Sequence, residues 1–98
     1  MYIKIHESYR TVVAICDSDL VGKTFEEGKR FLDIKESFYK GEEKTEEQIE
    51  KIMRDLFKED STFNIVGEQA TKTALKVGII SEEGILNIQG IPYALGLL

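Results

Sequence analysis

Residues 63–78 read FNIVGEQATKTALKVG, a short apolar run followed by a helical pattern. The first four residues are typical of a buried strand, and the glycine after them marks a turn. Small side chains then recur at helical spacing, with Ala70 and Ala74 on one face. Gly78 stands where the end of a helix favours left-handed backbone. A further apolar segment at 85–88 lies between glycines, so the region predicts a right-handed strand–helix–strand unit with two parallel strands.

The remaining chain predicts three more strands and another helix. The strands are expected at residues 2–6, 10–16 and 29–39. Thr45 followed by Gln48 is a capping box, so a helix is expected from there to about residue 60. The predicted order is β-β-β-α-β-α-β within one α+β domain over residues 1–98. A mixed sheet opens with an antiparallel hairpin and carries both helices on one face.

The register of that hairpin decides whether the single cysteine and the single histidine can meet. A turn centred between Ser8 and Tyr9 makes the numbers of paired residues sum to seventeen. His6 and Cys16 then lie about 16 Å apart and on opposite faces. This register excludes a Cys–His nucleophile pair and makes Cys16 a small hydrophobic residue of the core.

Charge and composition narrow the range of partners. The 98 residues have a net charge of −5 and a pI near 4.9, which is the wrong sign for a protein that chiefly binds phosphate. Residues 42–60 hold eight acidic and four basic side chains, a solvated helix face that would suit a basic partner. No apolar run reaches the ~18 residues of a membrane helix, and the first ten residues lack the pattern of a signal peptide. We therefore expect a cytoplasmic protein.

The loop after residue 16 contains fragments of known chemical motifs. Residues 22–24, Gly-Lys-Thr, match the end of a phosphate-binding loop, but Asp17 stands where that motif needs its first glycine. Asp17, Asp19 and Asp33 could converge at one sheet edge around a cation such as magnesium. That convergence is the basis of an alternative function as a small carboxylate- or metal-dependent enzyme. The lysines and aromatics of residues 23–40 are the basis of a second alternative, a weak RNA-contacting domain.

Three segments, in this order, resemble a known family. They are CDSDLVGK at 16–23, VGEQA at 66–70 and IQGIPY at 88–93. With them the chain is similar, over nearly its full length, to the archaeal family labelled Domain of Unknown Function 424. That family has no established activity to carry over, and it is associated only loosely with archaeal translation genes.

The resemblance implies roles for a few of these residues. Glycines in each segment would mark backbone turns. Lys23, Glu68 and Pro92 would be their polar or rigid neighbours on one surface. Tyr93 stands where the resemblance leads us to expect histidine, which argues against an imidazole-dependent role there.

The end of the sequence is unusual because residues 91–98, IPYALGLL, are almost wholly apolar. Such a tail has to pack on its own sheet or on another chain, a second copy included. Because each catalytic motif is incomplete, we predict a non-catalytic interaction module without a cofactor, whose partner is a basic or ribosome-associated protein. The candidate surface residues are Lys23, Glu68, Pro92, Tyr93, Leu95 and Leu97.

Overall fold

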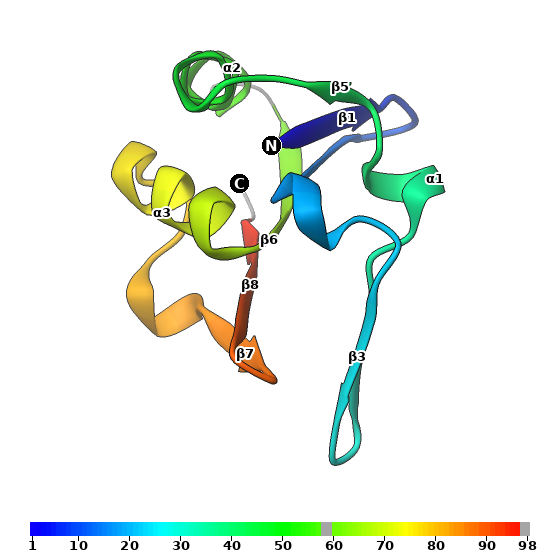
Figure 1. Cartoon of the computed structure of the whole chain (residues 1–98). Helices are drawn as coiled ribbons and strands as arrows, with labels where there is room; N and C mark the ends of the chain where they lie inside the picture. The colour runs from blue at the N-terminus through cyan, green and yellow to red at the C-terminus, as the bar shows by residue number, and fades with distance from the viewer. Residues whose placement is uncertain (58–59, 97–98) are drawn as a thin grey trace.

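A computed structural model describes residues 1–57 and 60–96 (Figure 1). Its centre is a six-stranded sheet in the order β5-β1-β2-β6-β8-β7. The strands are β1 (Tyr2–His6), β2 (Thr11–Cys16), β5 (Glu42–Glu43), β6 (Ser61–Val66), β7 (Leu86–Ile88) and β8 (Ile91–Gly96). β2 and β6 are parallel, and the other neighbouring pairs are antiparallel. The predicted mixed sheet with an N-terminal hairpin is confirmed.

The register of the hairpin differs from the prediction by one residue. Paired residues sum to eighteen, so the turn is centred on Tyr9, and Ser8 donates its hydroxyl to the Arg10 carbonyl across it at 2.9 Å. A slip of one residue moves every side chain to the other face. His6 and Cys16 therefore share a face, and the prediction of opposite faces was wrong. They are still four ladder positions apart, about 13 Å at the rise of a strand.

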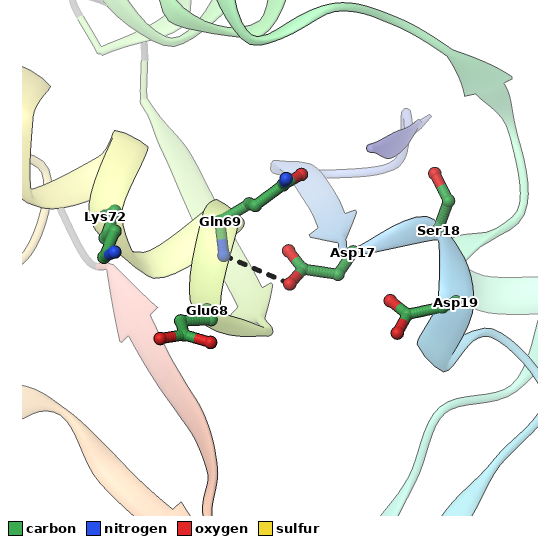
Figure 2. Close-up of a pocket in the computed structure, with 6 residues that line it drawn as sticks. All are labelled: Asp17, Ser18, Asp19, Glu68, Gln69 and Lys72. Carbon is green, nitrogen blue, oxygen red and sulfur yellow. Dashed lines mark hydrogen bonds between the residues drawn. The ribbon is translucent and has the colours of Figure 1, made fainter.

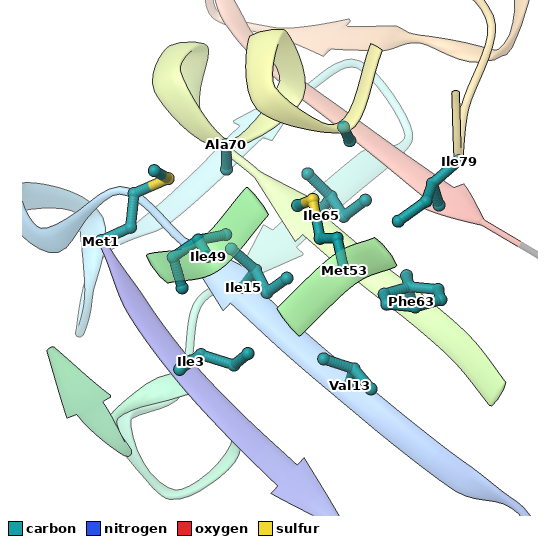
Figure 3. Close-up of a cluster of buried hydrophobic side chains, with 11 residues drawn as sticks. Met1, Ile3, Val13, Ile15, Ile49, Met53, Phe63, Ile65, Ala70 and Ile79 are labelled. Atoms are coloured by element: carbon teal, nitrogen blue, oxygen red, sulfur yellow. The ribbon is translucent and has the colours of Figure 1, made fainter. Parts of the chain in front are cut away.

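Two helices cover one face of the sheet, as the sequence predicts (Figure 1). α2 (Glu46–Leu56) begins with the predicted capping box, in which Thr45 and Gln48 each accept a hydrogen bond from the other's backbone N–H. α3 (Glu68–Val77) ends at Gly78 in the left-handed conformation. The expected end of α2 near residue 60 was too late, and residues 58–59 lie outside the described part. Figure 3 shows the apolar core that both helices form with β1, β2 and β6.

Shorter elements cover part of the second face. They are η1 (Ser18–Leu20), the hairpin of β3 (Thr24–Glu27) and β4 (Arg30–Asp33), and α1 (Glu36–Tyr39). Side chains from these elements and from β2 and β6 form a second buried cluster, which includes Cys16, Leu20, Ile34, Tyr39 and Val66. The sheet is thus packed on both sides, which explains the continuous apolar run in β2.

The predicted strand at 29–39 was wrong in both extent and pairing. Only Arg30–Asp33 is a strand, and it pairs with β3 in a separate two-stranded sheet. Gly28, with φ +64°, makes the tight turn between these strands. The chain then turns into α1, which stacks Phe38 on the His6 ring at 4.6 Å between centroids and buries Tyr39.

The C-terminal segment explains why the strand–helix–strand prediction was only partly right. β7 runs in the same direction as β6, as expected, but β8 lies between them and is antiparallel to both. The apolar tail therefore supplies an interior strand over Ile91–Gly96, while Leu97 and Leu98 lie outside the described residues. Across residues 1–57 and 60–96, the helices are too short or too polar to cross a membrane.

Candidate functional site

The carboxyl ends of the parallel strands β2 and β6 meet at the start of α3. Asp17, directly after β2, accepts hydrogen bonds from the backbone N–H groups of Gln69 (3.1 Å) and Ala70 (2.9 Å). These N–H groups have no partner within the helix, and the positive end of the helix dipole favours a carboxylate there. Gly67 has φ +110°, and a Cβ at this position would collide with the Asp17 carboxyl group. Asp17 therefore caps α3 from a neighbouring strand.

A polar cavity of about 610 Å³ opens beside this cap (Figure 2). It is lined by Asp17, Ser18, Asp19, Glu68, Gln69 and Lys72. Asp33 lies on β4 instead, with Oδ2 4.0 Å from the Lys35 ammonium. In the described part of the chain, no three His, Cys, Asp or Glu side chains are grouped to hold a metal ion. Asp17, Asp19 and Asp33 therefore do not form the cluster that the metal-dependent alternative requires.

A second cavity, of about 260 Å³, lies on the face of the sheet opposite α2 and α3, and we name it the sheet groove. It is lined by Leu32, Tyr39, Asn64, Ile65, Val66, Leu86, Tyr93, Ala94 and Leu95. The ladder brings these residues together, because Tyr93 of β8 pairs with Leu86 of β7 and Leu95 pairs with Asn64 of β6. Leu86 is 51% exposed and Leu95 is 57% exposed. Two large apolar side chains thus face solvent beside a largely apolar cavity.

Three side chains of the sheet groove have polar groups without a hydrogen bond in residues 1–57 and 60–96: Tyr39, Asn64 and Tyr93. Tyr39 is only 6% exposed. Within the described chain, Ser61 Oγ is the one fully buried side-chain N or O atom lacking a partner, so the Tyr39 hydroxyl reaches solvent. Burial, and then the nearby Cys16 thiol, raise the pKa of Tyr39 to about 12. The hydroxyl therefore remains a hydrogen-bond donor at neutral pH.

Comparison with known proteins identifies the family of this chain and a protein of similar fold. Residues 6–96 match the family described as "Protein of unknown function (DUF424)". The chain belongs to this family. A crystal structure of "an uncharacterized conserved protein from Methanopyrus kandleri" has a similar fold, with a TM-score of 0.84 and 27% sequence identity over 96% of this chain and 87% of that one. No curated protein matches the chain.

The DUF424 fold distributes the predicted surface residues over separate places. Tyr93 and Leu95 line the sheet groove, whereas Glu68 lines the polar cavity. Lys23 is exposed at the turn before β3, where its carbonyl accepts from the Ile34 N–H. The Pro92 carbonyl accepts a hydrogen bond from the Gly67 N–H. Leu97 lies outside the described residues.

The other side chains of the groove in this DUF424 protein were not predicted from the sequence. Asn64 gave a signal, because it is the polar residue in the apolar run 63–66. Tyr39 gave none, because residues 29–39 were interpreted as one strand. Leu32 and Leu86 approach the groove from β4 and β7, whose positions the local sequence does not specify.

The cysteine and the histidine of this DUF424 chain are both used in packing. His6 Nε2 lies 2.8 Å from the Phe38 carbonyl oxygen. Cys16 is fully buried, and burial first, with Asp17 next, raises the pKa of its thiol to about 12. A thiol that stays protonated at neutral pH is not an activated nucleophile.

Proposed function

We propose that this DUF424 protein is a non-catalytic binding module that holds an apolar side chain of a basic partner protein in the sheet groove. The observation that supports this function is the exposure of Leu86 and Leu95 beside the cavity. Large apolar side chains grouped in one exposed patch are typical of interaction sites, because their burial on binding is favourable.

The size of the groove is compatible with an apolar side chain of a partner protein. It holds about 260 Å³, at the small end of the volumes of ligand sites. That volume suits one large apolar side chain or two smaller ones. Leu86 and Leu95 then form the rim that excludes water around this anchor.

Charge favours a basic partner. The residues that line the groove are all uncharged, so the field around it is that of the whole chain, which has a net charge of −5. This field attracts a basic surface and repels a phosphate backbone. A ribosomal or other RNA-binding protein would supply such a surface. A partner of this kind would connect the protein to translation.

A selection from a displayed random peptide library tests this function. The wild-type protein should enrich peptides with a large apolar residue flanked by lysine or arginine. Leu95→Asp should weaken their binding by at least about tenfold, because it places a charge in the patch that the anchor covers. Tyr9→Asp is the matched control, since Tyr9 is fully exposed in the β1–β2 turn and the charge change is the same.

The proposal fails under three outcomes. Peptides that bind Leu95→Asp as well as the wild type would place the contact elsewhere. Enrichment of acidic peptides would contradict the charge argument. Self-association of the wild type that Leu95→Asp abolishes, seen by sedimentation, would make the occupant a second copy of the chain.

A further inference from the structure

We infer that Tyr39 and Asn64 form a polar recognition element in the sheet groove, and that it takes an amide group of the bound segment. This inference rests on the proposed function and deepens it. It starts from Asn64, whose side chain lies between Ala14 and Leu95 on the ladder and faces the groove. A carboxamide offers a donor and an acceptor side by side.

A ligand that covers the half-exposed Asn64 without bonding to it would bind at a cost. Its neighbours along the chain, Phe63 and Ile65, and its partner across the ladder, Leu95, are apolar, and its side chain has no hydrogen bond within the described residues. Covering an unpaired amide with an apolar anchor removes its water without replacing the lost hydrogen bonds, which weakens binding. A groove that bound only hydrocarbon would therefore be better served by leucine. The carboxamide suits a ligand that returns both hydrogen bonds.

Tyr39 supplies the second half of the element. Tyr39 is only 6% exposed. Its hydroxyl has no hydrogen bond in the described chain and still reaches solvent. With Asn64, the groove then presents two kinds of donor and one carboxamide acceptor. The complementary group has a carbonyl and an N–H next to each other, which is an amide. A protonated amine would lack the acceptor, and a carboxylate would lack the donor.

A base edge also has adjacent donors and acceptors. The net charge of −5 on the chain disfavours the phosphates that would accompany it. The structure therefore favours a peptide or side-chain amide of a protein.

Two small probes of the same shape test the inference by NMR titration of the full chain. N-isobutylacetamide presents an apolar group and an amide, whereas isobutyl acetate lacks the N–H. The wild type should bind the amide about fivefold more tightly than the ester, because one net hydrogen bond is worth about that much. Asn64→Leu should remove this preference and leave the ester bound. Tyr39→Phe should weaken both probes, since both retain the carbonyl.

Thr62→Val is the matched control, because Thr62 lies two residues earlier on the same side of β6 and outside the groove lining. It should keep the wild-type preference, and thermal melts of all variants should show that each is folded. Equal affinity of the wild type for amide and ester, or a preference that survives Asn64→Leu, would overturn the inference. If Leu95→Asp still abolished peptide binding in that case, the proposed function would stand without the amide-binding element. Tighter binding of adenosine than of the amide probe would also overturn it, in favour of a nucleobase.

Discussion

At the scale of single residues, Asp17 and Gly67 depend on each other. Asp17→Ala removes both acceptors from the start of α3, which should cost about 2 kcal/mol of unfolding free energy. Gly67→Ala introduces a Cβ against that carboxyl group at φ +110°, and should cost at least about 2 kcal/mol. In the double variant the collision is gone, so its cost should be smaller than the sum. Chemical denaturation measures this cycle, and additive costs would contradict the coupling.

Asp19→Ala is the control for this cycle, since Asp19 is exposed and makes no hydrogen bond within the described residues, and it should change stability by less than about 0.5 kcal/mol. The sequence indicated that Gly67 marks a turn and placed Asp17 in the loop after residue 16. It did not indicate that they meet, because fifty residues separate them. Their contact exists only because β2 and β6 are neighbouring parallel strands.

At the scale of elements, the capping box at the start of α2 is a signal that the local sequence carries, and its contribution to stability can be measured. Thr45→Ala removes the acceptor for the Gln48 N–H and should lower the unfolding free energy by about 1 kcal/mol. Thr45→Asn keeps an acceptor at this position and should lose much less. Thermal or urea unfolding compares the two variants, and equal losses would show that the threonine methyl group, not the cap, stabilises the helix.

Elements with such local signals were predictable, and elements without them were not. The capping box, the apolar run of β2 and the Gly78 terminus depend on neighbouring residues, and all three are confirmed. The β3–β4 hairpin is mostly exposed, so little alternation marks it. The sheet groove draws on β4, α1, β6, β7 and β8. The apolar tail pointed to Tyr93 and Leu95, whereas Tyr39 and Asn64 come to line the same groove only through the fold.

At the scale of the whole molecule, the two faces of the sheet are covered differently. α2 and α3 close one face over the larger core. On the other face, α1 and the β3–β4 hairpin bury Cys16 and Tyr39 but leave Leu86 and Leu95 exposed. The same layer that forms the groove therefore buries two weakly acidic residues, Cys16 completely and Tyr39 for most of its surface. The pH at which Cys16 and Tyr39 lose their protons therefore depends on whether α1 and the β3–β4 hairpin stay packed over them.

Stability should fall at high pH for this reason. The pKa of Cys16 rises from 9.0 to about 12 and that of Tyr39 from 10.0 to about 12 on folding. Between these limits the unfolded chain loses protons that the folded chain keeps, so the free energy of unfolding falls by up to about 1.4 kcal/mol per pH unit for each group. Urea unfolding under a reducing agent should show the decline from about pH 9 in the wild type, but only from about pH 10 in Cys16→Ala. Parallel curves for the two proteins between pH 9 and 10 would mean that water reaches the thiol and that the second layer is open.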